Sequence, residues 1–110
     1  MPFINISTSI KVDDKKELLE ESILLLSSLT KKSKRFVMAK LNDEMPMYFD
    51  DESPCCFLEI RSIGSLSPSE IVKPLSNFIF KKIGISIDRI YIYFEDVPAS
   101  RWGWNGKTFG

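Results

Sequence analysis

The chain has 110 residues, of which 44% are hydrophobic and 12% aromatic, which predicts one folded domain over residues 1–110 and excludes general disorder. Fifteen Lys and Arg residues balance fifteen Asp and Glu residues, so no overall field draws the protein to nucleic acid or to an anionic membrane. The absence of histidine excludes histidine-based triads, histidine–metal sites and the usual general base near neutral pH.

The first predicted element is a strand over residues 2–8, in which Ile4 and Ile6 alternate with polar residues. Pro2 at its start has two interpretations. It is either an ordinary first residue of a strand, where its missing N–H is tolerated, or a secondary amine exposed by removal of Met1. A small second residue such as proline normally permits this removal, whereas a retained methionine would leave a tertiary amide without basicity.

A helix is predicted next, with Asp13 or Asp14 as its N-cap and Glu17 at the third helical position after Asp14. The helix ends near Lys31. Its wide apolar face consists of Leu18, Leu19, Ile23, Leu25, Leu26 and Leu29.

An extended segment over residues 35–43 and a turn-rich connection over residues 44–54 follow, and residues 55–63 then read as another strand. The next helix has stronger start signals, because Ser67 is a predicted N-cap and Glu70 would close a capping box. Its apolar residues at helical spacing are Ile71, Leu75, Phe78, Ile79 and Ile83, and Pro68 and Gly84 are placed at its first turn and left-handed cap.

The last strand is predicted over residues 88–96, before an irregular or short-stranded tail over residues 97–110. The order β-α-β therefore occurs twice, as an internal duplication at roughly 50–55 residues. Short links make each unit a right-handed crossover with parallel strands. We expect an α+β fold, in which both helices cover one face of a four-stranded mixed sheet.

The other face of that sheet is not polar in this sequence, because Tyr91 and Tyr93 oppose Ile90 and Ile92. A single sheet covered on one side exposes such residues to water. We therefore expect the uncovered face and the aromatic tail to bury against other copies of the chain, in an obligate symmetric oligomer.

Several features occur together in an order that is specific as a set. They are the Met-Pro start, the repeated β-α-β plan, "SIG" at residues 62–64, "DRIYIYFED" at residues 88–96 and "GWNGKTFG" at residues 103–110. With these features, essentially the whole chain resembles the macrophage migration inhibitory factor and D-dopachrome tautomerase family of the tautomerase superfamily. The resemblance implies a homotrimer whose sheets form a barrel, active sites at subunit interfaces and no cofactor or metal. It also implies keto–enol tautomerase activity on aromatic 2-oxo acids such as phenylpyruvate.

The resemblance implies that Pro2 is the catalytic base and acid, that Lys32 binds the substrate carboxylate and that Ile63 lines the pocket with its backbone. Burial of a terminal amine among apolar side chains lowers its pKa, and a nearby lysine acts in the same direction. Such an amine would be neutral at pH 7, as general base catalysis requires.

Four aromatic residues complete the site that the resemblance implies. Tyr91 matches an aromatic wall contributed by a neighbouring subunit, and Trp104 and Phe109 match tail residues that frame the rim. Tyr93 departs from the pattern, because mammalian members have asparagine there. A phenol keeps a hydrogen-bond donor but narrows the pocket, so substrate preference is the property that this change affects.

The family also suggests a cytokine-like signalling or binding module with a vestigial pocket. Cys55 and Cys56 invite a redox interpretation, because mammalian members carry C-x-x-C in this strand, but Leu58 replaces the second cysteine. Adjacent cysteines in a strand point to opposite faces, so small buried residues explain them better.

The basic run at residues 31–35 is typical of a solvated helix end rather than a nucleic-acid patch, and the signature of RNA-binding ferredoxin-like domains is missing. Caps and loops explain the pairs Asp13–Asp14 and Asp50–Glu52 better than a metal. No basic leader, long apolar run or disulfide framework is visible. We therefore expect a cytoplasmic protein with a small-molecule partner, and no nucleic-acid or membrane partner.

Overall fold

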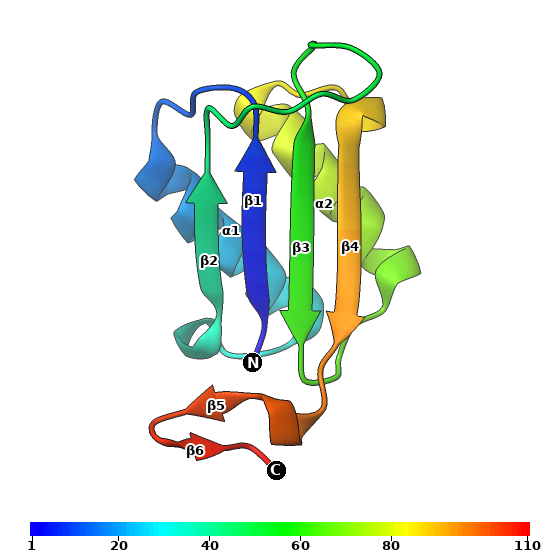
Figure 1. Cartoon of the computed structure of the whole chain (residues 1–110). Coiled ribbons are helices and arrows are strands. Elements are labelled where there is room, and N and C mark those ends of the chain that lie inside the picture. The colour runs from blue at the N-terminus through cyan, green and yellow to red at the C-terminus, as the bar shows by residue number, and fades with distance from the viewer.

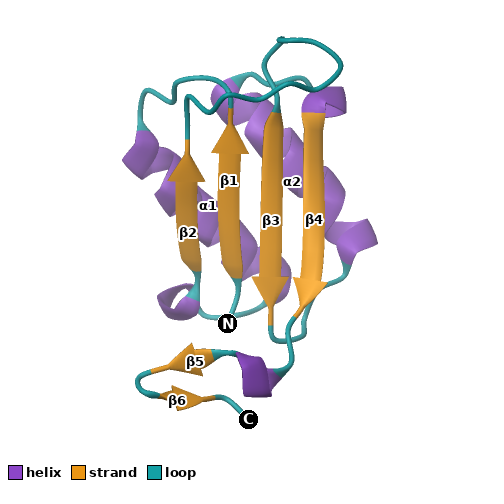
Figure 2. Ribbon diagram, viewed as in Figure 1, coloured by secondary structure: helices purple, strands orange, loops and turns teal.

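The computed structural model describes all 110 residues, which form a four-stranded sheet with two helices packed against one face (Figures 1 and 2). The strands are β1 (Phe3–Thr8), β2 (Met38–Asn42), β3 (Cys56–Ser62) and β4 (Ile90–Asp96), in the order β2-β1-β3-β4. β1 pairs parallel with β2, β3 pairs parallel with β4, and the central pair β1–β3 is antiparallel. The predicted α+β fold with two β-α-β units is confirmed.

Helix α1 (Lys15–Thr30) begins and ends where the sequence predicts. The Asp14 carboxylate accepts a hydrogen bond of 3.0 Å from the Glu17 N–H, so Asp14 is the N-cap. Lys31 then takes a left-handed conformation, with φ of 58°, and ends the helix. Neither α1 nor the second helix has the length and hydropathy needed to cross a bilayer.

Helix α2 (Pro68–Ile83) ends at Gly84 in the predicted left-handed conformation, but the capping box predicted at its start is wrong. The Ser67 side chain makes no capping hydrogen bond. Its backbone carbonyl instead accepts the Glu70 N–H at 2.9 Å and the Ile71 N–H at 3.1 Å. The Glu70 N–H, which the capping box would have paired with the Ser67 hydroxyl, therefore already has a partner.

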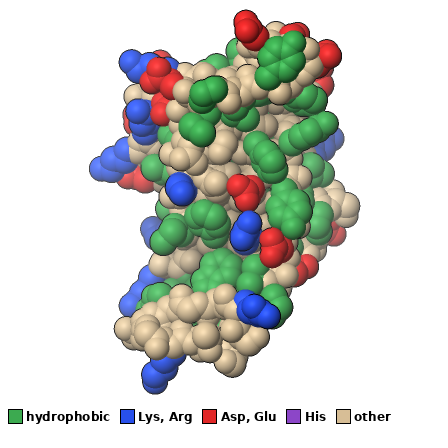
Figure 3. All heavy atoms as spheres, in the orientation of Figure 1, with side chains coloured by type: hydrophobic (Ala, Val, Ile, Leu, Met, Phe, Trp, Pro, Cys, Tyr) green, Lys and Arg blue, Asp and Glu red, His purple; other side chains and the backbone are tan.

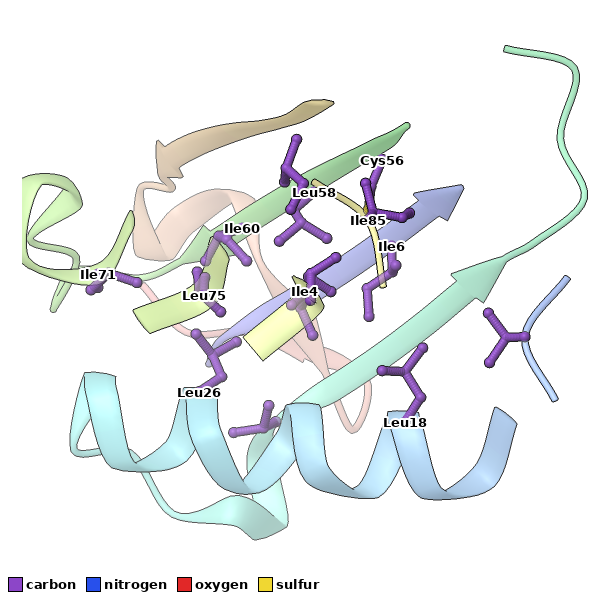
Figure 4. Close-up of a cluster of buried hydrophobic side chains, with 14 residues drawn as sticks. Ile4, Ile6, Leu18, Leu26, Cys56, Leu58, Ile60, Ile71, Leu75 and Ile85 are labelled. Atoms are coloured by element: carbon purple, nitrogen blue, oxygen red, sulfur yellow. The ribbon is translucent and has the colours of Figure 1, made fainter. Parts of the chain in front are cut away.

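The core lies between the helices and the inner face of the sheet (Figure 4). Alternate residues of the two central strands are fully buried there, among them Ile4, Ile6, Leu58 and Ile60. They pack against helix residues that include Leu26, Leu75 and Ile79. The alternation in the strands and the helical spacing therefore identify the core face correctly.

Two polar residues that the sequence analysis did not place in the core are also buried, on α1. The Ser22 hydroxyl donates to the Leu18 carbonyl at 2.6 Å, and the Thr30 hydroxyl donates to the Leu26 carbonyl at 2.7 Å. Each hydroxyl thus has a hydrogen-bond partner inside its own helix, which offsets the free-energy cost of burying it.

The outer face of the sheet carries a polar chain that crosses all four strands. Asn42 donates to Asn5 at 3.0 Å, and Asn5 donates to Glu59 at 3.2 Å. The Arg61 guanidinium lies 3.3 Å from Glu59 and 3.8 Å from Glu95. Charged side chains therefore lie among hydrophobic ones on this face in Figure 3.

Three aromatic residues of β3 and β4 share this outer face, namely Phe57, Tyr91 and Tyr93, which are 41%, 62% and 47% exposed. The expectation of a face that is not polar was therefore only half right. The polar chain is assembled from four strands by their register, and strand-by-strand alternation does not show which of these polar residues become neighbours.

Residues 34–36 and 87–89 form short 3-10 helices where the sequence analysis extended the second and last strands. A serine precedes each of them. The Ser33 carbonyl accepts the Phe36 N–H at 3.0 Å, and the Ser86 carbonyl accepts the Arg89 N–H at 2.8 Å. These local hydrogen bonds compete with the strand and delay its start.

One side chain, that of Arg89, makes several contacts with the connection between β2 and β3. Arg89 donates to the carbonyls of Phe49 at 2.6 Å, Ser53 at 2.8 Å and Pro54 at 3.1 Å, and its guanidinium lies 3.3 Å from Asp51. The predicted turn-rich connection is thus an ordered loop, at the end of the sheet opposite the N-terminus (Figure 1).

The tail forms a small hairpin of β5 (Gly103–Trp104) and β6 (Lys107–Thr108). Asn105 and Gly106 make its turn with φ angles of 51° and 79°, as Asn-Gly hairpin turns require. Figure 1 shows this hairpin beyond the end of the sheet where β1 begins, so the tail lies near the start of the chain.

Candidate active site

Two cavities meet at the start of the chain. The first, called here the Pro2 cavity, has a volume of about 320 Å³ and is lined by Met1, Pro2, Arg35, Phe36 and Trp104, together with other mainly apolar residues. Pro2 is fully buried, and its carbonyl accepts the Met38 N–H at 3.2 Å. That bond fixes the start of β1 against β2, so the first residues of the chain have a defined place.

The second, called here the Lys32 cavity, has a volume of about 340 Å³ and is lined by residues that include Met1, Lys32, Phe36, Ile63 and Phe109. Met1 and Phe36 line both cavities, so these two residues lie between them. No Asp or Glu lines either cavity. The surroundings of the chain start therefore carry positive charge without a compensating carboxylate.

Local structure positions Lys32 and Ile63. Lys32 follows the left-handed Lys31 that ends α1, and its carbonyl accepts a hydrogen bond from the Ser27 hydroxyl. Ile63 follows the last residue of β3, where the Ser62 carbonyl accepts the Val97 N–H at 2.8 Å. Both residues thus come from the ends of regular elements that converge on Met1.

The amine at the chain start is electrostatically perturbed. Burial lowers the pKa of the Met1 α-amino group below its ordinary value of 8.0, and the Lys32 charge lowers it further. The Pro2 nitrogen itself is an amide while Met1 precedes it. This part of the fold therefore disfavours a positive charge at the terminus, and it does so by desolvation first and by repulsion second.

Aromatic rings connect the tail to this site. The Trp104 ring packs edge-on against Phe36, with centroids 5.8 Å apart, and stacks on Phe109 at 6.3 Å. The structure thus places Trp104 at the Pro2 cavity and Phe109 at the Lys32 cavity.

Tyr91 and Tyr93 line neither of these cavities in the single chain. Tyr91 lies beside Phe57 in the sheet register and packs against Phe49, with ring centroids 4.6 Å apart, at the far end of the sheet. The Tyr93 hydroxyl donates to Glu95 at 3.4 Å. A role for either tyrosine at this site requires a second copy of the chain, which is what the resemblance implies for Tyr91.

Sequence reasoning missed Arg35 and Phe36 as residues of the site. They belong to the 3-10 turn that follows Lys32, a segment predicted partly as strand and partly as a solvated basic run. The sequence signal is Ser33, because a serine at this spacing before Phe36 favours a helix-like turn. Such a turn would have placed Phe36 beside the catalytic candidates.

The cysteines lie apart from this site, at the other end of β3. Cys55 and Cys56 are both 3% exposed and not joined by a disulfide. Burial raises the pKa of the Cys56 thiol to about 12, and the neighbouring Cys55 acts in the same direction. Nowhere in the chain do three His, Cys, Asp or Glu side chains form a group that could hold a metal ion.

We expect these thiols to resist alkylation in the native protein, because burial blocks access and Cys56 has almost no thiolate at pH 8. Iodoacetamide at pH 8 should leave the intact mass unchanged, and in guanidinium chloride it should add two adducts. A Ser69→Cys variant, which places a thiol on the exposed start of α2, provides the reactive control. Rapid alkylation of Cys56 in the native wild type would contradict the expected burial.

The four-stranded sheet with two helices on one face, together with a terminal amine beside two cavities, is typical of the tautomerase fold. A solved macrophage migration inhibitory factor homologue from Prochlorococcus marinus has a TM-score of 0.92 and 43% identity, with 98% of this chain and 99% of that chain covered. A homologue from Trichinella spiralis is 30% identical over 99% of this chain and 100% of its own length. Macrophage migration inhibitory factor from Xenopus tropicalis is 29% identical over 99% of both chains.

The family model described as macrophage migration inhibitory factor (MIF) matches residues 1–110. The chain therefore belongs to the macrophage migration inhibitory factor family, which lies within the tautomerase superfamily.

Proposed function

We propose that this protein is a keto–enol tautomerase for aromatic 2-oxo acids such as phenylpyruvate, with Pro2 as general base and acid once Met1 is removed. The observation that carries the proposal is the place of the chain start between two cavities and beside Lys32, where burial and the Lys32 charge lower the pKa of the Met1 amine. Removal of Met1 puts the Pro2 nitrogen at the terminus, where we expect the same two causes to act on it. Membership of a family in the tautomerase superfamily supports the same reaction class.

The reaction needs no cofactor in this scheme. The neutral Pro2 nitrogen takes a proton from the carbon next to the substrate carbonyl, and the electron pair moves through the new C=C bond to the carbonyl oxygen. The Lys32 ammonium binds the carboxylate and stabilises the negative charge that develops beside it. The prolinium then returns its proton to that oxygen, so the enol forms and Pro2 is neutral again.

The proposed site is completed by assembly. A homotrimer is supported by the exposed Tyr91 and Tyr93 and by the half-exposed rings of Trp104 and Phe109 at the rim. In this assembly both tyrosines of one copy pack on the substrate ring that its neighbour holds. Tyr93 replaces an asparagine of the mammalian pattern, so the preferred ring substituents are proposed to differ from those of mammalian members.

The direct test combines intact mass with turnover. Protein whose mass lacks one methionine should interconvert keto and enol phenylpyruvate, followed by the ultraviolet absorbance of the enol. Protein prepared with methionine aminopeptidase blocked keeps Met1 and serves as the matched control, because its Pro2 nitrogen is an amide. Equal turnover by the two forms, or none by the processed form, would overturn the proposal.

A second candidate is a cytokine-like signalling or binding module with a vestigial pocket, which the family match favours. It predicts that processed protein binds its partner equally well after the pocket has been inactivated. For either function we propose a cytoplasmic location, supported by two free cysteines side by side in a chain without disulfides.

A further inference from the structure

The two cavities at the chain start each contain one cationic side chain. Lys32 lines one cavity and Arg35 lines the other, and neither lining includes a carboxylate. The two cations therefore line two adjoining cavities, which share Met1 and Phe36 as lining residues. A ligand that filled both spaces would meet a positive charge in each of them.

Arg35 is free to bind an external anion. It takes part in none of the chain's ion pairs, whereas Arg61 and Arg89 bind carboxylates of the chain itself. Its guanidinium lies over the Phe36 ring, 5.5 Å from the centroid, and its backbone N–H donates to the Ser33 hydroxyl at 3.3 Å. The head group is thus held beside the cavity with its N–H donors unused.

Removal of Met1 changes the shape of this region. Met1 and Phe36 are the two residues common to both linings, so loss of Met1 leaves Phe36 as the one residue that lines both. We expect the Lys32 and Pro2 cavities to join into one cleft when this shared residue is removed. Its middle is apolar and aromatic, with Phe36 and Trp104 in edge-on contact, which suits a ring with an anionic group at each end.

We propose that Arg35 binds a second acidic group, so that the site prefers aromatic 2-oxo acids that carry an anionic substituent on the ring, opposite the oxo acid. The carboxylate of the oxo acid lies at Lys32, the ring lies on the aromatic middle of the cleft, and the far acid is held by the forked N–H groups of Arg35. The substrate assignment rests on the proposed function, whereas the binding of a dianion does not.

The test is therefore a binding experiment with cinnamate and 4-carboxycinnamate, two acids without the 2-oxo group that differ by one carboxylate on the ring. Both tryptophans of the chain, Trp102 and Trp104, line the Pro2 cavity, so quenching of their fluorescence reports occupancy. Processed wild-type protein should bind 4-carboxycinnamate about tenfold more tightly than cinnamate, the preference that a charge-assisted pair supplies.

Substitution separates Arg35 from general positive charge. Arg35→Gln should bring the ratio of the two dissociation constants close to one, and Arg35→Lys should restore part of it because the charge returns without the fork. Lys34→Gln is the matched control, because Lys34 is an exposed neighbour that lines neither cavity, and it should keep the wild-type ratio. Thermal unfolding checks that each variant is folded.

A wild-type ratio near one, an Arg35→Gln ratio equal to that of the wild type, or failure of 4-carboxycinnamate to bind would each overturn the inference. The turnover of phenylpyruvate is scored separately. Tight binding of the dianion without turnover would leave the Arg35 subsite standing and remove the tautomerase proposal. Turnover of phenylpyruvate without a preference for the dianion would do the reverse.

Discussion

Substitution of Pro2 by alanine, with Met1 removed, is expected to lower kcat/KM for phenylpyruvate by at least about 100-fold, the range that a positioned general base contributes. Alanine leaves a primary amine at the terminus, but it has no ring to hold the nitrogen. In the structure the Pro2 ring is fully buried, so its loss removes the packing that holds the nitrogen in place and lets the amine move.

The comparison requires that the variant be folded and processed. Intact mass confirms that Met1 has been removed, and circular dichroism confirms the fold. Pro46→Ala is the matched control, because Pro46 lies exposed in the connection between β2 and β3 and lines neither cavity. If Pro2→Ala and Pro46→Ala both kept wild-type turnover, the Pro2 ring would not be needed for catalysis, which would contradict this account of the base.

Substitution of Lys32 by methionine is expected to have the second largest effect, a fall in kcat/KM of about 10- to 100-fold. The loss should appear mainly as a higher KM, because the substrate carboxylate loses its charged partner. Lys34→Met removes the same charge from an exposed neighbour outside both cavities and should leave KM within about twofold of wild type.

The same variant makes a prediction about pH. Burial and the Lys32 charge both lower the pKa of the Met1 amine, and we expect them to act in the same way on the Pro2 amine once Met1 is removed, of which only the neutral form accepts a proton. Removal of the Lys32 charge therefore raises this pKa, and the acidic limb of the rate profile moves to higher pH. Burial remains as the larger cause, so the pKa should stay below the ordinary value. A limb that moves to lower pH would contradict this account.

The fold was largely predictable because its signals are local. Alternation at Ile4 and Ile6 and helical spacing at Leu75 and Ile79 mark faces that the structure buries. Asp14 caps α1 as expected because its partner, the Glu17 N–H, is three residues away. Failures came where two local hydrogen bonds competed. The Ser67 carbonyl took the N–H that its hydroxyl was expected to bind, and Ser33 began a 3-10 turn instead of a strand.

The candidate site was predictable only in part. The resemblance brought Pro2, Lys32 and Ile63 together, and the structure places all three around Met1. Arg35 was missed because its position depends on the 3-10 turn over residues 34–36. The basic run at residues 31–35 reads as a solvated helix end and does not indicate this turn. The polar chain from Asn42 to Glu95 was also missed, since it depends on the register of four strands rather than on any one segment.

The two ends of the chain meet at the same cavity, since Met1 and Phe109 both line it. In connectivity the molecule is thus almost a closed ring, of the kind that tolerates circular permutation. A permuted chain that joined Gly110 to Pro2 and opened in another loop would keep each strand beside its present neighbours. It would nevertheless place the Pro2 nitrogen in a peptide bond, so in the proposed mechanism the position of this one break, rather than the order of the elements, decides whether the chain has its general base.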